Sequence, residues 1–534
     1  MSNVETNLPN VKTSLQLCRR NTLGDAFHRT AQRCRDKVAV IFNERRWSYR
    51  ELDVAVSNVA HALLAQGCNK GDRVAAYARN SDAYVILMLG CVRAGLVHVP
   101  INFGLSGDEL VYVLQQSGAK VLFHDALASD NVAAIVDQVE LQQIGTFAEG
   151  GTLGEGGKLD VLTLTHGDNI LPPDIDLDGE ELAQIIYTSG TTSRPKGVMM
   201  SHNSLLNNER IAIQYLGISE QTRGISALPF YHAVLHVNCL PYLLAGATQI
   251  ILDRPEPIVL LELIEREKIN SLFAPPTVLI KMLRDTAFDH YDLSSLTHIL
   301  YGASIMPAAT VAELSKRLPG AGLYNIYGQT EIGPIATVLF PHEHRERPTS
   351  AGRPVLNTET RIVDEAMNDV PVGERGEIVH RSPSLLQGYW NKPEETAEVF
   401  AGGWFHSGDM GYMDEEGYIY VVDRIKDVIN TGGVLVSSRE VEECLYKHDA
   451  IAQVAVIGLS HPKWVEAIAA VAMIKEGSIV LEEELIAHAR AQLAYFKVPK
   501  RIVFVEALPI NPSGKILKRE LRDELKDLFS SDWA

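Results

Sequence analysis

Between residues 73 and 124, two patterns of apolar and polar positions follow each other along the chain. Short apolar runs typical of strands, "RVAAYA", "LVHVPIN" and "AKVLFHD", are separated by longer runs of helical character, "SDAYVILMLGCVRAG" and "SGDELVYVLQQSG". Each helical run begins at a serine, Ser81 or Ser106, a residue type that caps helix N-termini. The same order of strands and helices returns at 248–300. Strands that alternate with helices predict an α/β fold with parallel, doubly wound sheets.

The pattern changes twice further along the chain. From about 352, short β-like runs ("TRIVDE", "GEIVHR", "GYIYVVDR") are separated by Gly, Pro and Asp turns, which predicts a small β subdomain over about 352–425. After 426, helical and strand-like runs resume, which predicts a separate α+β domain. We therefore expect a large N-terminal domain, 1–425, and a C-terminal domain, 426–534. The Gly/Asp-rich patch at 148–180 predicts a loop or a short β excursion.

Composition excludes several classes of protein. The chain has 534 residues, 46% of them hydrophobic, and a formal net charge of −18. No Lys/Arg run resembles a nucleic-acid footprint, so we expect no nucleic-acid partner. We find no signal-peptide pattern at the N-terminus, and the longest uncharged apolar run, "AYVILMLGCV", is too short to span a membrane. Six widely spaced cysteines without a Cys-x-x-Cys pair fit a reducing compartment, so we expect a cytoplasmic protein.

The stretch "YTSGTTSRPKG" at 187–197 contains the strongest candidate chemistry. It follows an apolar strand, "LAQII", and its glycines let the backbone approach a ligand closely. Hydroxyl and loop N–H groups suit phosphate oxygens, and Lys196 adds a positive charge. The spacing differs from G-x-x-x-x-G-K-[ST], because Pro precedes the lysine and Gly follows it. The stretch therefore predicts a phosphate-binding loop unlike that of P-loop NTPases; the alternative is a flexible surface turn.

Three other stretches carry candidate functional residues. "NIYGQTE" at 325–331 ends in Glu331, "WFHSGDMG" at 404–411 places Asp409 in a glycine turn, and "PINPSGKILKREL" at 509–521 places Lys515 at the start of a helix. Each stretch alone is ordinary, but their joint occurrence in this order is specific.

Together with "VDRIKD" (422–427) and "NTGGVLVSSREVE" (430–442), these stretches resemble the adenylate-forming superfamily over about 20–526. Its members include acyl-CoA synthetases, adenylation domains of peptide synthetases and firefly-type luciferases. The resemblance implies a large N-terminal domain and a small, mobile C-terminal domain joined at a hinge.

The resemblance also implies a first step in which a carboxylate joins the α-phosphate of ATP and expels pyrophosphate, a reaction that needs alignment and charge neutralisation. Glu331 would hold Mg²⁺, Thr330 would contact the α-phosphate, and Lys515 would bridge the carboxylate and the α-phosphate. Asp409 would accept hydrogen bonds from the ribose, assisted by Arg424. The other implied ATP-binding residues are Thr188, Ser189, Gly190, Thr191, Thr192 and Lys196 at the β- and γ-phosphates, and Gly302, Ala303, Ser304, Tyr327, Gly328 and Gln329 around the adenine.

In the implied second step, the thiol of coenzyme A attacks the acyl-adenylate. The C-terminal domain would rotate about Lys426, withdraw Lys515 and present Gly432 and Gly433 to the pantetheine arm. The sequence departs from the common pattern at Ser193, which replaces Gly, and at Ser407, which replaces Thr. It also has Leu435 and Ser438 where Asn and Pro are common, and these two lie near the implied thiol channel.

The segment after "LPF" (228–230) usually forms one wall of the acid pocket in this superfamily. Here it reads "YHAVLHVNCLPYLLAGATQIIL" and contains no charged residue, which argues against amino acids and dicarboxylates as substrates. Val234, Leu235 and Val237 suit an apolar acid. His232 occupies a position that is often a gating residue, and the alternative is a hydrogen-bonded interior histidine; His236 is a weaker candidate. The "PHEH" cluster at 341–344 predicts a solvated loop rather than a metal site.

These features favour an acyl-CoA synthetase for a medium- or long-chain fatty acid. An aryl-CoA ligase is the nearest alternative, followed by a fatty acyl-AMP ligase that loads an acyl carrier protein. A luciferase-like oxygenase and a catalytically inactive nucleotide-binding regulator are further alternatives. The sequence is compatible with a homodimer and does not determine the oligomeric state.

Overall fold

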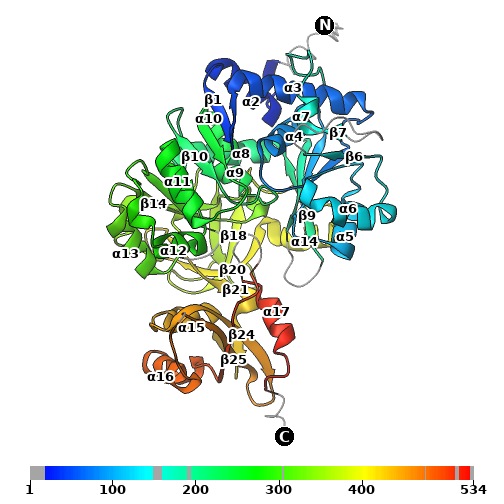
Figure 1. Ribbon diagram of the computed structural model, residues 1–534. Coiled ribbons are helices and arrows are strands. Elements are labelled where there is room, and N and C mark those ends of the chain that lie inside the picture. Colours follow the sequence, from blue (N-terminus) through cyan, green and yellow to red (C-terminus); the bar gives the residue numbers. More distant parts are fainter. Residues whose placement is uncertain are drawn as a thin grey trace, which may run out of the picture.

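The computed structural model describes residues 18–147, 159–188, 194–302, 306–475, 477–510 and 516–529. Two large, mostly parallel sheets and a small antiparallel sheet make up the larger part of the molecule, and a fifth of the chain folds into a lobe beneath them (Figure 1). The doubly wound α/β fold predicted from the pattern is confirmed.

The first large sheet has eight strands. Its central strands pair in parallel, and β9 and β19 add an antiparallel edge. In order across the sheet the strands are β19 (Gly388–Tyr389), β9 (Lys196–Ser201), β8 (Leu182–Thr188), β4 (Val97–Pro100), β3 (Arg73–Tyr77), β5 (Val121–His124), β6 (Gln143–Thr146) and β7 (Leu159–Asp160). Strands buried on both faces, such as "RVAAY" and "VHVP", read as continuous apolar runs, as helix-covered parallel sheets require.

The second large sheet has nine strands and takes up a strand pair from near the N-terminus. In order they are β16 (Arg353–Pro354), β15 (Thr337–Leu339), β14 (Gly322–Tyr327), β13 (His298–Gly302), β12 (Ser271–Phe273), β10 (Arg223–Ser226), β11 (Thr248–Ile251), β1 (Val38–Phe42) and β2 (Arg45–Ser48). Strands β10 to β14 are parallel, so their carboxyl ends meet at one edge of the sheet.

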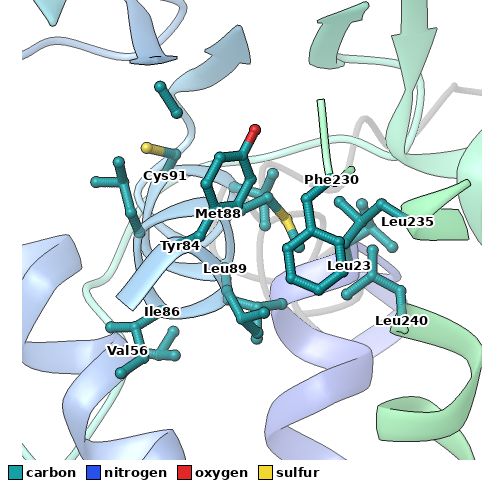
Figure 2. Packing of buried hydrophobic residues seen from close by; sticks show 14 of the residues in the cluster. Leu23, Val56, Tyr84, Ile86, Met88, Leu89, Cys91, Phe230, Leu235 and Leu240 are labelled. Carbon is teal, nitrogen blue, oxygen red and sulfur yellow. The ribbon is translucent and has the colours of Figure 1, made fainter. Parts of the chain in front are cut away.

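Helices pack against both sheets. They are α2 (Leu23–Cys34), α3 (Tyr49–Ala65), α4 (Asp82–Arg93), α5 (Gly107–Ser117), α6 (Ser129–Ile135), α7 (Val161–Leu164), α8 (His202–Tyr215), α9 (Leu235–Asn238), α10 (Leu240–Ala245), α11 (Pro257–Glu267), α12 (Pro276–Arg284), α13 (Ala308–Arg317) and α14 (Pro393–Val399). Helix α4 is buried along its whole length, and Tyr84 on it contacts a core that includes Leu23, Phe230, Leu235 and Leu240 (Figure 2).

The remaining strands form two smaller sheets. The four-stranded antiparallel sheet consists of β17 (Glu359–Val363), β18 (Gly376–Arg381), β20 (Phe405–Met413) and β21 (Ile419–Arg424). A 3₁₀ turn at Ile425–Asp427 then leads into the lobe. The lobe contains β22 (Ile429–Thr431), β23 (Val434–Val436), α15 (Ser438–Tyr446), β24 (Ile451–His461), β25 (Val465–Ile474), α16 (Glu482–Gln492), β26 (Arg501–Phe504) and α17 (Lys518–Glu524).

Two local predictions had different outcomes. Ser81 caps α4, because its hydroxyl accepts a hydrogen bond from the Tyr84 N–H at 3.1 Å. Ser106 is the N-cap residue of α5, as predicted, but its side chain makes no capping hydrogen bond. In the Gly/Asp-rich patch, the described residues include the short strand β7 and helix α7.

Candidate active site

A cavity of about 420 Å³ lies between the larger part of the molecule and the lobe. Tyr327, Gly328, Asp409, Arg424 and Lys426 line it from the side of the large sheets and the four-stranded sheet. From the lobe, it is lined by Arg439, Glu442, Tyr446, Gln453, Val454, Ile510, Ile516, Leu517, Lys518, Arg519 and Glu520. Residues from both ends of the predicted motif set therefore face the same space.

Asp409 is the hydrogen-bonding centre of this cavity. Strands β20 and β21 pair Asp409 with Arg424, whose Nε lies 2.7 Å from Asp409 Oδ1. The hydroxyl of Tyr327 and the amide of Gln329 donate to Asp409 Oδ2 at 2.7 and 2.8 Å. Burial raises the pKa of Tyr327, and the adjacent Asp409 carboxylate raises it further. These donors hold a buried carboxylate in place, with its edge toward the cavity.

Ser407 contributes to the same arrangement. Its hydroxyl accepts from the Asp409 N–H at 3.0 Å and donates to the carbonyl of Ile378. The hydroxyl of a serine is therefore sufficient for these two hydrogen bonds at a position where the superfamily commonly has threonine.

Glu331 lies beside Lys196, although the two are far apart in sequence. The hydroxyl of Tyr389 donates to Glu331 Oε1 at 3.1 Å, and Lys196 Nζ lies 4.9 Å from the centre of the Tyr389 ring. Burial raises the pKa of Glu331. Thr330 is next to Glu331 at the start of a 3₁₀ turn. At the mouth of the predicted phosphate loop, Thr188 pairs with Lys196 in the β8–β9 register.

Two glycines of the motif set are required by close backbone packing. A Cβ at Gly302 would lie 2.4 Å from the carbonyl oxygen of Ile326. A Cβ at Gly328 would lie 2.1 Å from that of Pro334. Larger residues would displace the strand ends that border the cavity.

Several predicted site residues lie outside the described residues, namely Ser189, Gly190, Thr191, Thr192, Ala303, Ser304 and Lys515, together with Ser193. The chain on either side of the 511–515 gap is nevertheless described. Ile510 and Ile516 form a β-bridge with each other, and both line the cavity.

Gly432 and Gly433 are placed apart from this cluster. They form the exposed turn between β22 and β23, with φ of 65° and 85°, and they are not among the residues that line the cavity. The N–H of Gly432 donates to the carbonyl of Trp464 at 2.6 Å. In this orientation of the lobe, the chain around Lys515 faces the cleft and the glycine turn does not.

The three predicted acid-pocket residues divide between two cores. Leu235 is buried with Phe230 and Leu240 (Figure 2), whereas Val237 packs with a different cluster against which the partly buried Val234 also lies. Burial lowers the pKa of His232 to about 4, and its Nε2 has no hydrogen-bond partner among the described residues. Asn238, at the end of α9, is 1% exposed, and both of its amide atoms also lack a partner there.

His236 is part of a buried hydrogen-bonded chain, as an interior histidine would be, and its lower rank as a candidate site residue stays a prediction. Its Nδ1 lies 2.6 Å from Glu209 Oε1, and its Nε2 lies 2.7 Å from Gln184 Oε1. Gln184 Nε2 in turn donates to His98 Nδ1 at 3.0 Å. Burial raises the pKa of Glu209 and lowers those of His98 and His236 to about 3. A protonated Glu209 that donates to a neutral His236 orients every hydrogen bond in the chain consistently.

The segment after "LPF" has no charged residue of its own, but an ionisable side chain from elsewhere in the fold reaches it. Glu209 reaches it from α8, and Glu209 Oε2 has no partner among the described residues. Sequence reasoning missed Glu209, Gln184 and Tyr389, because each lies outside the recognised motifs; only the folded arrangement brings them to His236 or Glu331.

The solvated-loop prediction for "PHEH" is wrong for two of its residues. Glu343 and His344 are buried, at 6% and 7% exposure. Glu343 accepts from the hydroxyl of Tyr418 at 2.6 Å, and His344 Nε2 lies 2.9 Å from the hydroxyl of Tyr301. Through these two hydrogen bonds, the cluster connects the residue that precedes β21 of the four-stranded sheet with β13 of the nine-stranded sheet.

The described residues contain neither a membrane-spanning helix nor a cluster of metal ligands. No helix there has the length and apolar character needed to cross a membrane. No group of three or more His, Cys, Asp or Glu side chains in that part of the chain is arranged to hold a metal ion.

Known proteins with this fold define the class. The chain superposes on the structure of ATP-bound MatB from Rhodopseudomonas palustris with a TM-score of 0.86 and 31% identity, covering 95% of this chain and 99% of that one. With apo MatB, at the same identity and coverage, the TM-score is 0.75. Large N-terminal and small C-terminal domains of this kind characterise adenylate-forming enzymes.

Sequence comparison identifies the family. The model for "AMP-binding enzyme" matches residues 27–390, and that for "AMP-binding enzyme C-terminal domain" matches residues 440–515. The chain therefore belongs to the AMP-binding enzyme family, as its motifs indicated, and is an AMP-forming acid–thiol ligase.

Two curated relatives differ in the acid that they are named for. A feruloyl-CoA synthase from Amycolatopsis is 37% identical over 508 residues, which cover 94% of this chain and 99% of the relative. A long-chain-fatty-acid–CoA ligase from Bacillus subtilis is 33% identical over 543 residues, covering 94% of each chain.

Proposed function

We propose that the protein converts an aromatic carboxylic acid to its acyl-adenylate with ATP, and then transfers the acyl group to coenzyme A. The observation that carries the proposal is the cavity in which Asp409, Arg424 and the chain flanking Lys515 face each other from two parts of the molecule. Such a cleft can align two reactants and surround a phosphate with preorganised groups.

The roles of the described residues follow from their placement. Asp409 Oδ1 keeps acceptor capacity beyond its bond to Arg424 and can accept from a ribose hydroxyl. Lys196, at the end of the phosphate loop, neutralises phosphate charge beside Glu331. Lys515 lies outside the described residues, and its proposed role of bridging the acid and the α-phosphate in the first step comes from the resemblance alone. We also propose the division of the chain near residue 425, with Lys426 as the hinge.

Glu331 fits a magnesium ion. Mg²⁺ is commonly held by one or two carboxylates together with substrate phosphates, and Glu331 offers one half-buried carboxylate near Lys196. Burial alone disfavours its ionised form, and a bound cation would restore it. Glu331 would hold the ion, which supplies neutralisation of phosphate charge, and Tyr389 would orient the carboxylate through its hydrogen bond.

The identity of the acid is argued from the residues of the 231–238 segment and from one relative. Two observations favour an aromatic acid with polar ring substituents over the fatty acid that the sequence suggested. Leu235 and Val237 are already packed in protein cores, and polar atoms of His232, Asn238 and Glu209 lack partners that a substituted ring could supply. The similarity to a feruloyl-CoA synthase points the same way.

A medium- or long-chain fatty acid is the second candidate. The uncharged segment at 231–252 and the similarity to a long-chain-fatty-acid–CoA ligase favour it. Val234 is the one residue of the three predicted pocket residues that is only partly buried.

A panel of acids distinguishes the candidates. Pyrophosphate release and thiol loss are measured with benzoates, hydroxycinnamates and straight-chain acids, each with and without coenzyme A. We expect the highest kcat/KM for a ring-substituted aromatic acid, with thiol loss equal to pyrophosphate release. Turnover only with straight-chain acids would refute the aromatic proposal. Adenylate that discharges only to a carrier protein would refute coenzyme A as acceptor.

A further inference from the structure

Ser438 occupies the junction between the lobe and the four-stranded sheet. It is the first residue of α15 and is fully buried. Its hydroxyl donates to Asp423 Oδ2 at 2.7 Å and accepts from Lys518 Nζ at 2.6 Å. One side chain thus links three elements, at a position where the sequence departs from the common proline.

The contacts around Ser438 cross the proposed hinge. Asp423 lies on β21, before residues 425–427, whereas Ser438 follows them. Ser437 reaches back too, with its hydroxyl 3.2 Å from Asp423 Oδ2 and from the carbonyl of Val422. Arg439 Nη1 donates to the carbonyl of Val421 at 3.2 Å. A rotation of the lobe about residues 425–427 would break these contacts.

Lys518 connects this junction to the segment that carries Lys515. It lies at the start of α17, three residues after Lys515, and its Nζ is 2.8 Å from Glu442 Oε1. Lys518 also lines the cavity, together with Ile516. Figure 1 shows α17 at the side of the lobe that faces β20 and β21. The hydroxyl of Ser438 therefore couples the position of α17 to Asp423.

We propose that Ser438 is a positioning residue that holds the lobe in the orientation for adenylate formation. The inference rests on the proposed two-step function. In this orientation the chain around Lys515 faces the cleft, and Gly432 and Gly433 do not. Contacts made in only one of two orientations shift the equilibrium toward it by their differential free energy. A proline at the same position has no hydroxyl and makes neither contact.

The test measures the two half-reactions separately. Acid-dependent ATP–pyrophosphate exchange reports adenylate formation, and thioester formation from purified acyl-adenylate and coenzyme A reports the second step. In Ser438→Ala and Ser438→Pro, we expect the ratio of thioester rate to exchange rate to rise about tenfold, the size of effect that loss of a hydrogen bond to a charged group produces. Ser438→Thr keeps a hydroxyl and should keep the ratio of the unaltered protein.

Two features guard against a merely structural effect. Proline is well tolerated at the first position of a helix, so Ser438→Pro removes the hydroxyl without breaking α15. Glu440→Gln is the matched control: Glu440 lies in the same helical turn and pairs with Lys497 inside the lobe. This control should leave the ratio unchanged.

The outcomes separate the inference from the function that it rests on. Equal loss of both half-reactions, or an unchanged ratio in Ser438→Ala and Ser438→Pro, would overturn the positioning role while leaving the ligase function standing. No acid-dependent exchange in the unaltered protein would overturn the proposed function, and the role of Ser438 with it.

Discussion

The cleft at Asp409 and the acid-binding segment at 231–238 treat buried polar atoms in opposite ways. At the cleft, Asp409 receives hydrogen bonds from Tyr327, Gln329 and Arg424 before any ligand is bound. Along the segment, His232 Nε2 and both amide atoms of Asn238 have no partner among the described residues. Because a buried polar atom without a partner is costly, the arrangement at the cleft is complete in itself, and we propose that a bound acid completes the arrangement along the segment.

This difference separates recognition of the nucleotide from recognition of the acid. The residues around Asp409 are charged and hydrogen-bonded to one another, so substitutions there should reduce turnover of every acid alike. The acid side should instead change which acid is preferred. The predictions below test that separation, from the largest expected effect to the smallest.

Replacing Lys515 should have the largest effect on the nucleotide side. Loss of a preorganised charge at a developing anion typically costs ~3–4 kcal/mol of barrier, so Lys515→Ala should slow adenylate formation by ~10²–10³-fold. Thioester formation from supplied acyl-adenylate should change far less. Rapid-quench assays of each step provide the measurement, with Lys526→Ala as an exposed lysine control. A comparable loss in both steps would contradict the proposed role.

Replacing Asp409 should weaken the binding of ATP and leave the preference among acids unchanged. Asp409→Asn removes the charge that pairs with Arg424 and one acceptor for the ribose, and hydrogen bonds to charged groups contribute ~1.5–3 kcal/mol. The KM for ATP should rise ~10- to 100-fold, while the ranking of acids stays the same. Steady-state kinetics with two acids are sufficient. A changed acid preference would break the separation of the two regions.

The buried histidine chain predicts an acid-sensitive fold. The pKa of His236 is about 3 in the folded protein and 6.5 ordinarily, so the unfolded chain takes up the proton first as pH falls. From pH 7 to pH 5 this group alone should therefore lower the free energy of unfolding by about 2 kcal/mol, whereas Glu209, whose pKa burial raises, contributes in the opposite direction. His236→Gln should make that slope shallower in urea titrations at the two pH values. An unchanged slope would show that His236 is not a buried neutral histidine.

Removing the unsatisfied amide of Asn238 should have the smallest effect on activity and only a small effect on stability. Asn238→Ala deletes two buried atoms without partners, so the free energy of unfolding should not fall by more than about 1 kcal/mol, even with a small cavity. The preference for a ring-substituted aromatic acid over a straight-chain acid should decrease ~10-fold, since one hydrogen bond to the ligand is lost. Unchanged selectivity would place Asn238 outside the acid site.

The sequence predicted the nucleotide side much better than the acid side. Alternating strands and helices gave the doubly wound sheets, because strand and helix periodicities are local. The motif residues Tyr327, Gln329, Asp409 and Arg424 meet as expected. The glycine turn predicted at Asp409 is wrong, because Asp409 lies within the strand β20, paired with Arg424 of β21. Tyr389 could not be found in this way, because its contact with Glu331 depends on how β19 pairs with β9.

The arrangement of the proposed acid-binding region could not be predicted from the sequence, for a physical reason. The hydrophobic pattern of the 231–252 segment says that it is buried, not which core each side chain enters. Leu235 and Val237 proved to lie in different clusters. Glu209 and Gln184, from α8 and β8, reach His236 only through the tertiary fold. The same reason explains why Glu343 and His344 were wrongly predicted to be solvated: their charged neighbours in the sequence indicated an exposed loop, but the tertiary fold buries both residues.

The most direct test of the account is isotopic exchange between pyrophosphate and ATP in the absence of coenzyme A. We predict exchange that requires the carboxylic acid, is retained without the thiol, and is strongly reduced in Asp409→Asn at subsaturating ATP. Exchange that needs coenzyme A, or nucleotide cleavage that ignores the acid, would contradict the claim that one cleft joins the acid to the α-phosphate.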